Sequence, residues 1–356
     1  MSKARQLAQK PSQPTGRKNL IINGAMNVAQ RDDEVTSITS SGYKTVDRFS
    51  IDYNSAGTWT MSQEGDGPDG FANSMKLLCT TAKSSLTSSN RIALRQRIEG
   101  QDLQNLKKGT SNARAVTLSF WCKSNKTGTY VVEIYDYDNS RHINKSFSVS
   151  SSATWEYKTI TFDGDTTGTL DNDNSHSFHI QWWLAASSVY TAGTLQTSWG
   201  ANDTDNRAVG VVNLADTVNN YFQITGVQLE VGSVATEFEH RSYGEELALC
   251  QRYFYKLANP TRYIGGGSAR STTQVYGMGQ SHPNPMRATP TAVLSGTIQY
   301  YRGDNAGDVT TFAPILSDWG WAGNGTCNAI SGMTDGQAVM VYIKNQNDSL
   351  SFDAEL

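Results

Sequence analysis

The sequence is poor in charged residues, which make up 18% of its 356 positions, and the 30 basic and 33 acidic side chains leave a net charge of -3. Binding to a phosphate backbone requires a net basic surface, so we expect no nucleic-acid partner. No apolar run approaches the roughly 20 residues that a membrane-spanning helix needs. We therefore expect no membrane insertion.

Cysteine is also scarce, and the four cysteines form no CxxC pair; they are Cys79, Cys122, Cys250 and Cys327. Structural zinc sites usually take their ligands from close pairs, so we interpret these residues as buried free thiols. The sequence contains no GxSxG, HExxH or Walker A motif. We therefore predict a protein that is not an enzyme and has no cofactor.

Proline is absent between Pro68 and Pro260, and in most of that stretch apolar residues alternate with polar ones. One example of such an alternating run is Val116, Leu118, Phe120 and Cys122. Short half-buried strands separated by Gly, Asn, Asp and Ser clusters are typical of an all-β sandwich or barrel. The pattern predicts a β-sandwich over residues 20–242.

The only convincing helical pattern runs from Tyr243 to Leu257, and we predict a linking amphipathic helix over residues 243–258. Its apolar stripe consists of Leu247, Cys250, Phe254 and Leu257. Such a stripe must be buried, either against its own sandwich or against the same helix of other subunits. We predict the oligomeric contact. Strand-like runs after the helix predict a second, smaller β domain over residues 259–356.

The first 19 residues differ from the rest because they carry no acid, and the first acidic residue of the chain is Asp32. Their composition cannot build a core, so we predict an extended N-terminal arm. The basic residues that such an arm would use for docking are Lys3, Arg5, Lys10, Arg17 and Lys18.

Aromatic residues are concentrated in two places that are candidates for sugar binding, since an exposed indole can stack on the apolar face of a sugar ring. Alternation places Trp182 in the core and Trp183 outward. The first group of candidates is Trp183, Tyr190 and Trp199, and the second is Tyr300, Tyr301, Trp319 and Trp321. The alternative for the first group is a sandwich face covered by a neighbouring subunit, and the alternative for the second group is burial in an ordinary core.

Two acidic clusters could supply the oxygen ligands that Ca²⁺ prefers. They contain Asp136 with Asp138, and Asp171 with Asp173. Solvated turns rich in Asp and Asn are commoner, so we predict no metal and keep the four residues as calcium candidates only. His176 and His179 are three positions apart, a spacing that points side chains to opposite faces of a strand.

Three stretches carry a family resemblance, and they occur in a consistent order. NLIINGAMNVAQR, residues 19–31, resembles the opening strand of carbohydrate-binding jelly rolls and, still more, the start of fibre proteins of tailed bacteriophages. GVQLEVGSVATEFEHRSYGEELALCQRYFYK, residues 226–256, is similar to a segment of phage tail-fibre and virion-associated proteins that closes the sandwich and leads through a short helix into a C-terminal domain. MRATPTAV, residues 286–293, resembles the stretch that comes next along the chain in such proteins.

The resemblance implies a jelly-roll sandwich in a virion fibre or appendage, usually a homotrimer. We therefore expect a structural component of a bacteriophage virion, a tail or head fibre. It would attach to other virion proteins through its N-terminal arm and present its β domains to host-surface glycans. Two alternatives remain: a purely structural decoration or adaptor protein, and a polysaccharide depolymerase. Depolymerases more often have long repetitive β-helices, and no repeat of 20–50 residues is visible.

Overall fold

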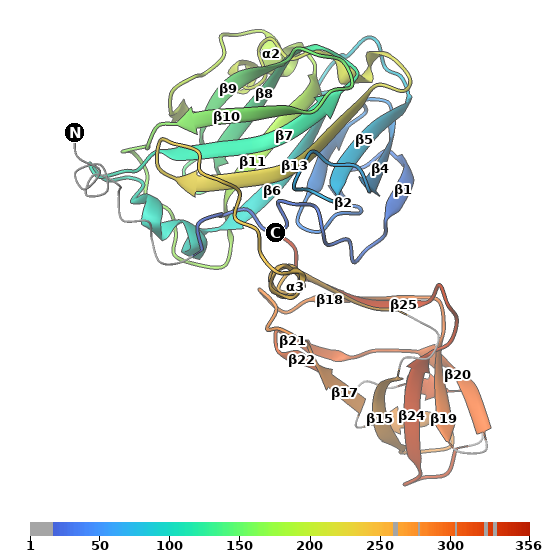
Figure 1. Cartoon of the computed structure of the whole chain (residues 1–356). Helices are drawn as coiled ribbons and strands as arrows, with labels where there is room; N and C mark the ends of the chain where they lie inside the picture. Colours follow the sequence, from blue (N-terminus) through green and yellow to red (C-terminus); the bar gives the residue numbers. More distant parts are fainter. Residues whose placement is uncertain (1–16, 259–262, 277, 303–304, 324–326, 330–332) are drawn as a thin grey trace.

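The computed structural model describes residues 17–258, 263–276, 278–302, 305–323, 327–329 and 333–356. Within them the predicted fold class is confirmed, since a β-sandwich is followed by a short helix and a smaller C-terminal β domain. Figure 1 shows the sandwich above, the C-terminal domain below and helix α3 between them. Among the described residues, no helix has the length and apolar character needed to cross a membrane.

The sandwich consists of two sheets in which neighbouring strands are antiparallel. Sheet A has the order β1 (Glu34–Ile38), β4 (Thr58–Glu64), β5 (Ser74–Thr81), β13 (Tyr221–Val231), β7 (Val116–Ser124) and β10 (Glu156–Phe162). Sheet B has the order β12 (Gly200–Ala201), β9 (Arg141–Val149), β8 (Gly128–Asp136), β11 (His176–Ala186), β6 (Arg91–Glu99), β3 (Ser50–Asn54) and β2 (Gly42–Tyr43). Short helical turns join the strands: η1 (Gly100–Leu106), α2 (Ser188–Thr191), η2 (Thr204–Asn206) and η3 (Leu214–Asp216).

One apolar core fills the space between the two sheets, and alternation along the strands supplies it. Phe120 of β7 and Trp182 of β11 meet edge to face across the core, with ring centroids 5.8 Å apart. Both side chains are fully buried, as the alternation of their strands predicted. Burial of such aromatic side chains dominates core stability because each removes a large apolar area from water.

The residues after Arg17 are bound to the segment that follows β13, more than 200 positions later. The backbone N–H groups of Lys18 and Asn19 donate to the carboxylate of Glu239 at 3.1 and 2.7 Å. Arg241 in turn donates to the carbonyl of Asn19 at 2.7 Å. The last residues of the predicted arm are therefore part of the sandwich, whereas residues 1–16 lie outside the described residues.

The close approach of these two segments requires a glycine. A Cβ atom on Gly24 would lie 2.1 Å from the carbonyl oxygen of Val227, which no side chain could tolerate. Val227 donates its N–H to the carbonyl of Gly24 at 2.9 Å, and the side chain of Asn19 donates to the carbonyl of Val227 at 3.0 Å. Two of the three stretches that carry the family resemblance thus form one interlocked unit.

Helix α3 (Tyr243–Gln251) is shorter than predicted. It begins with a capping box, in which Ser242 and Glu245 each bond the other's backbone N–H. The prediction that it continues to Leu257 is wrong, because Phe254–Ala258 form strand β14, which pairs with β25. The aromatic run at positions 253–255 favours a strand, and pairing with β25 satisfies its backbone.

The expected apolar stripe is consequently not one helical face. Leu247 and Cys250 lie on α3, where Cys250 is fully buried against Ile22. Phe254 and Leu257 lie in β14, and both are buried inside the protomer. The stripe serves packing within one chain, and the homotrimer stays a prediction without support from it.

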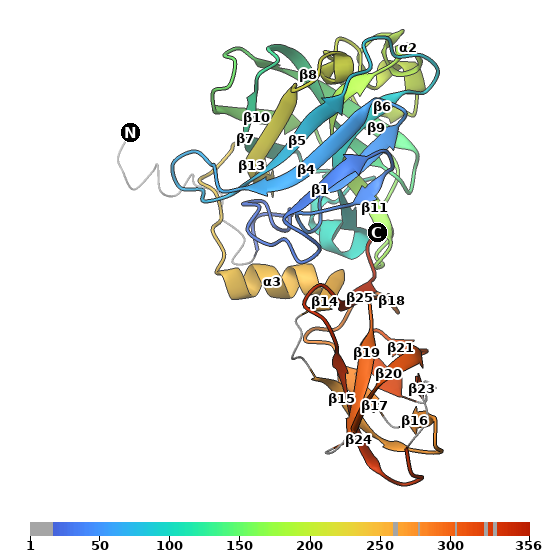
Figure 2. The same ribbon diagram turned by 90° about the vertical axis from the view of Figure 1, so that its right-hand side faces the viewer.

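The C-terminal domain combines a closed barrel with two small sheets. The barrel has the order β15 (Tyr263–Ala269), β16 (Gln274–Tyr276), β23 (Cys327–Ala329), β20 (Asn305–Thr311), β19 (Ile298–Arg302) and β24 (Ala338–Ile343). The small sheets are β14, β25 (Ser349–Asp353) and β18 (Thr291–Ser295), and β17 (Met278–Ser281), β22 (Gly320–Gly323) and β21 (Ile315–Ser317). Figure 2 shows that the first of these small sheets lies nearest to α3.

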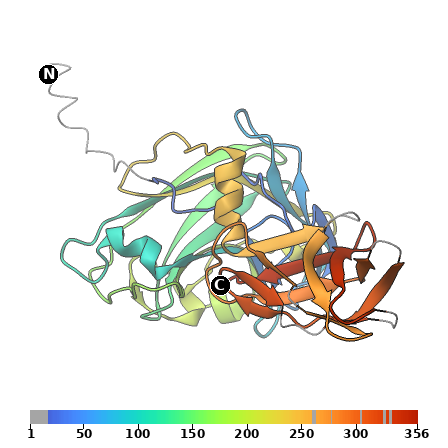
Figure 3. The same ribbon diagram turned by 90° about the horizontal axis from the view of Figure 1, so that it is seen from below.

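Ion pairs connect the C-terminal domain to the base of the sandwich. Figure 3 shows the C-terminal domain and α3 in front of the sandwich when the molecule is seen from below. Arg31 pairs with Asp353 at 3.1 Å, and Arg48 pairs with Glu355. The guanidinium of Arg31 also lies over the ring of Phe254, 3.7 Å from its centroid. The two parts of the chain are therefore joined by charged contacts as well as by the α3 linker.

Candidate functional site

An aromatic groove of about 400 Å³ opens on the outer face of sheet A. Its lining includes Trp121 of β7, Tyr157 of β10, and Phe71, Phe238 and His240 from two loops. Trp121 is half-buried, and 46% of the surface of Tyr157 is exposed. This is the aromatic surface of the sandwich that we assign as its candidate ligand site.

Strand register brings the two main rings together. Trp121 pairs directly with Tyr157 across β7 and β10, and their ring centroids are 5.2 Å apart with the planes tilted by 49°. Directly opposed side chains in antiparallel strands lie close enough to act as one surface. The pair thus forms a fixed platform supported by the sheet.

The far wall is a second group of rings, carried by the loop before β5 and the segment after β13. Phe71 packs against Phe238 and His240 with centroid distances of 5.0 and 5.3 Å. These contacts tie the two loops to each other. The wall is therefore held by its own packing and does not depend on a ligand.

A glycine in a β-bulge keeps the floor of the groove open. The register of β13 against β7 shifts between Thr225 and Gln228, and Gly226 in that bulge has a φ of 61°. A Cβ atom at this position would lie 2.8 Å from the ring of Phe71 and 3.1 Å from that of Trp121. Glycine is needed here for two reasons: it adopts the left-handed backbone conformation without strain, and its lack of a side chain leaves space between the two rings.

Polar groups line the same groove. They comprise the carboxylates of Asp69 and Glu237 and the hydroxyl of Ser119. Carboxylates accept hydrogen bonds, and a hydroxyl both donates and accepts them. A ring platform with acceptors beside it suits a ligand that has an apolar face and several hydroxyl groups.

The first predicted aromatic group is buried. Trp183 lies on the outer face of sheet B, opposite Trp182, but it is fully buried, so the prediction that it faces solvent is wrong. The segment that contains α2 covers it: the ring of Tyr190 lies 5.1 Å from that of Trp183, and Tyr190 is itself 7% exposed. Trp183 donates its indole N–H to buried Glu133 at 3.2 Å.

The ring and the indole N–H of Trp199 also make contacts within the protein. Its ring lies 5.9 Å from that of Phe178, and its indole N–H donates to the carbonyl of Asp163 at 2.6 Å. The ammonium group of Lys108 lies 5.5 Å from its ring centroid. Trp199 therefore closes the edge of the core, and the structure does not combine it with Trp183 in one open surface.

The second predicted group is divided between interior and surface. Tyr300 and Trp321 are buried at 1% and 3% exposure, whereas Tyr301 and Trp319 are 39% and 68% exposed. The ring of Trp321 packs edge to face on Phe312, 5.5 Å away. Trp319 lies between β21 and β22, so it does not share one platform with Trp321.

The four calcium candidates do not form one set of metal ligands. The carboxylate of Asp136 is paired with the ammonium group of buried Lys108 at 2.5 Å. Asp138 accepts the backbone N–H of Asp171, and Asp173 accepts the N–H of Ser175. In the parts of the chain that the structure describes, no three His, Cys, Asp or Glu residues are grouped to hold a metal.

Lys108 occupies a position lined by oxygen atoms. Besides Asp136, its ammonium group contacts the carboxylate of Asp165 at 3.1 Å and the carbonyls of Thr167 and Gly168, both at 2.8 Å. An ammonium group thus supplies the positive charge that these buried carboxylates need.

The two histidines of β11 lie on the same side of the strand, contrary to the prediction. The register against β6 shifts between His176 and Phe178, and this irregularity brings the rings of His176 and His179 to 5.4 Å. Burial lowers the pKa of His176 to about 3, and burial together with Arg95 lowers the pKa of His179 well below its usual value. Both rings are therefore neutral at ordinary pH.

Of the predicted docking residues, Lys3, Arg5 and Lys10 lie outside the described residues. Lys18 is tied to the sandwich, with its ammonium group 2.5 Å from the hydroxyl of Thr236. Arg17 donates to the carbonyls of Asn19 and Leu20 at 3.0 and 3.2 Å. The docking role of the arm stays a prediction.

Sequence reasoning missed the groove on sheet A. The alternation that places Phe120 and Cys122 inward also places Trp121 outward, so part of the signal was present. Its partner Tyr157 follows 36 positions later, and only the pairing of β10 with β7 connects them.

Comparisons with known proteins gave no matching family model and no matching curated protein. Among solved structures, the enzymatically active domain of tailspike protein 4 of bacteriophage CBA120 is similar at 13% identity and a TM-score of 0.33, covering 60% of this chain and 21% of that one. A protein of Bacteroides thetaiotaomicron described as sugar-binding is similar at 15% identity and a TM-score of 0.35, covering 60% of this chain and 100% of that one. The module TmCBM61, solved with β-1,4-galactotriose, has 10% identity and a TM-score of 0.29, with 60% and 99% covered.

Proposed function

We propose that this protein is a glycan-binding structural component of a bacteriophage virion, a tail or head fibre that acts by binding and not by catalysis. The observation that carries the binding role is the groove on sheet A, where Trp121 and Tyr157 form an exposed ring pair next to carboxylate and hydroxyl groups. Such a site matches the apolar face and the hydroxyl groups of a neutral sugar.

The virion role is supported by the resemblance of residues 19–31 and 226–256 to segments of phage fibre proteins. Both stretches take part in the interlocked base of the sandwich, where Asn19, Gly24 and Val227 meet. Residues 1–16 precede that base and carry three of the predicted docking cations. In this proposal the arm binds other virion proteins, and several copies of the sandwich, most simply a homotrimer, provide avidity for weak sugar contacts.

The sugar-binding role is tested by calorimetric titration of the full chain with neutral oligosaccharides selected on a glycan array. Trp121→Ala should weaken binding by about fivefold or more, because stacking on an aromatic ring contributes on the order of 1 kcal/mol or more. Gly226→Ala should also weaken it, since the new methyl group enters the space between Phe71 and Trp121.

Trp319→Ala is the matched control, because Trp319 is the most exposed tryptophan of the C-terminal domain. It should leave the affinity unchanged. If Trp319→Ala abolishes binding and Trp121→Ala does not, the site lies in the C-terminal domain and the assignment of the groove is wrong. Release of reducing ends from the bound polysaccharide would contradict the non-enzymatic role.

The docking role is tested by deleting residues 1–16 and no more, since Lys18 and Asn19 are hydrogen-bonded into the sandwich. The truncated protein should keep its thermal stability and oligomeric mass but fail to enter virus particles. Normal incorporation of this variant would show that the arm is not the attachment segment.

A further inference from the structure

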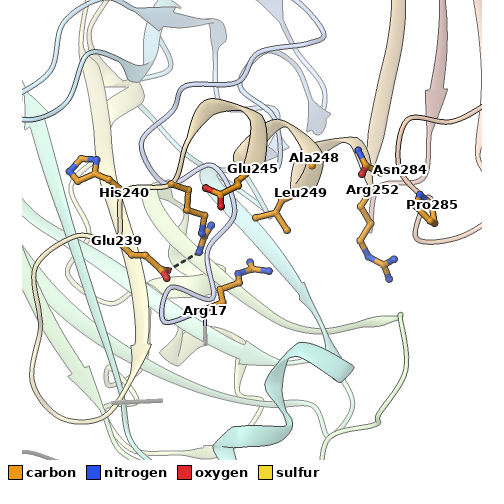
Figure 4. A pocket seen from close by; sticks show the side chains of 10 residues that line it. Arg17, Glu239, His240, Glu245, Ala248, Leu249, Arg252, Asn284 and Pro285 are labelled. Carbon is orange, nitrogen blue, oxygen red and sulfur yellow. Dashed lines mark hydrogen bonds and ion pairs between the residues drawn. The ribbon is translucent and has the colours of Figure 1, made fainter. Parts of the chain in front are cut away.

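A second groove, of about 710 Å³, lies where the sandwich, α3 and the C-terminal domain meet. We call it the junction groove; it is lined by Arg17, Glu239, His240, Arg241, Glu245, Ala248, Leu249, Arg252, Asn284 and Pro285. Figure 4 shows Leu249 extending from α3 on the side where Arg17 and Arg252 lie, with Asn284 and Pro285 beyond. Its volume is in the range of ligand pockets.

The walls of the junction groove are fixed to one another. Asn284 of the C-terminal domain donates its side-chain amide to Gln251 at the end of α3, at 2.9 Å. Arg252 forms two hydrogen bonds with the carboxylate of Glu99, at 2.9 and 2.7 Å, which bind the same end of the helix to the sandwich. The groove is thus a built cavity between two domains.

Three arginines from separate segments line it, and two of them are neutralised. Arg241 is paired with Glu239 at 3.0 Å and with Glu246 at 3.2 Å. Arg252 is paired with Glu99 at 2.7 Å. Within the part of the chain that the structure describes, the partners of Arg17 are two carbonyls and no carboxylate. Arg17, which is exposed, is therefore the arginine of the groove for which no ion pair is found among the described residues.

The acids of the groove do not cancel the charge of Arg17. Both oxygens of Glu239 already accept N–H groups of Lys18 and Asn19, and one of them also accepts from Arg241. Glu245 is held by Ser242 in the capping box. Desolvation, followed by the neighbouring charge of Arg241, lowers the pKa of Arg17, and the carboxylates of Asp102 and Glu246 oppose this shift. An anion placed beside this guanidinium would relieve the electrostatic cost.

We propose that the junction groove binds an acidic saccharide, with the carboxylate of a uronic-acid-type sugar on Arg17 and the apolar face of its ring against Leu249 and Pro285. A guanidinium forms parallel hydrogen bonds with a carboxylate, a geometry that gives specificity as well as affinity. Asn284 provides a side-chain amide at the same wall for the sugar hydroxyls.

The two grooves then differ in ligand charge. The sheet A groove has two carboxylates among its lining residues, Asp69 and Glu237, and no arginine or lysine. The junction groove has three arginines and two glutamates. The first suits neutral sugars and the second suits acidic ones, so this inference is independent of the proposed function of the sheet A groove.

The test is calorimetric titration of the full chain with trigalacturonic acid and, in parallel, with a neutral galactose trimer. Wild-type protein should bind the acidic trimer, and Arg17→Gln should weaken this binding by about tenfold, as expected for loss of a charged hydrogen-bond donor. Leu249→Ala should weaken it less. Arg270→Gln, which removes an exposed arginine of the barrel, is the matched control and should leave it unchanged.

Three outcomes would overturn the proposal: no binding of the acidic trimer by wild-type protein, equal binding by Arg17→Gln, or equal affinity for a hexaglutamate peptide, which would replace the sugar by a protein partner. Trp121→Ala separates this proposal from the sheet A groove. It should weaken binding of neutral sugars while the affinity for the acidic trimer stays unchanged. If Trp121→Ala abolishes binding of the acidic trimer, the acidic ligand occupies the sheet A groove and the proposal fails.

Discussion

The outer face of sheet A is open around its tryptophan, whereas the outer face of sheet B is covered around its tryptophan. Sheet A exposes Trp121 and Tyr157 in an open groove, whereas sheet B holds Trp183 beneath the segment that contains α2. Around Trp183 the polar groups are buried and paired, as in the two hydrogen bonds from Arg207 to Glu133 at 2.7 and 2.8 Å. An outward-facing tryptophan on a strand can therefore be a ligand platform or part of a second core, depending on what covers it.

This difference predicts that Trp183 contributes more to the stability of the fold than Trp121 does. Trp183→Ala should lower the free energy of unfolding by about 3–5 kcal/mol, the usual cost of emptying a buried aromatic site. Trp121→Ala should lower it by about 1 kcal/mol, because that ring is only half-buried. Chemical denaturation of both variants measures the difference. Similar losses in the two would contradict the distinction between a buried and an open face.

The same contrast between buried and exposed groups applies to ion pairs. Lys108→Met leaves Asp136 and Asp165 buried without their cation and should cost about 3 kcal/mol. Lys76→Met removes a surface cation of sheet A, 3.8 Å from Glu64, and should cost less than about 1 kcal/mol. Thermal unfolding of the two variants provides the measurement, and an equal change in Tm would count against the role assigned to Lys108.

A further prediction concerns acid sensitivity. Burial lowers the pKa of His176 and of His179, so the folded protein leaves both rings neutral at a pH where the unfolded chain protonates them. Stability should therefore fall as the pH drops below about 6.5, by up to about 1.4 kcal/mol per pH unit for each histidine. Denaturation of wild type and His179→Gln at pH 7.5 and about 5.5 checks this. The variant should lose less stability on acidification, and an unchanged pH dependence would be inconsistent with a buried neutral His179.

Alternation was the most informative part of the sequence. It located strands such as β7 and β11 and their inward residues, and it assigned Trp182 to the core correctly. It gave the wrong secondary structure where the local spacing of apolar residues disagrees with the pairing of strands. Residues 253–257 continued a helical spacing, yet Tyr255 and Leu257 face the C-terminal core from strand β14. Pairing of β14 with β25, nearly 100 positions later, places these side chains in that core, and local spacing does not reveal this pairing.

The candidate sites were harder to predict than the fold. Clusters in the sequence, such as the one around Trp183 and Tyr190, proved to be packing partners in a second core. The residues that form the sheet A groove come from β7, β10, β13 and two loops, which are far apart in the sequence. Arg17 lies in a segment predicted to be an arm, and the other residues of the junction groove come from the segment before α3, from α3 itself and from the C-terminal domain.

The sequence by itself determined an all-β chain with few charges, a basic first segment and strands that bury alternate residues, since these depend on local composition and on the period of a strand. The tertiary structure decided which outward faces stay open. It covered Trp183, paired Trp121 with Tyr157 and brought Arg17 to the base of α3. Exposure depends on contacts between residues far apart in the chain, and such contacts are a property of the folded topology and not of local spacing.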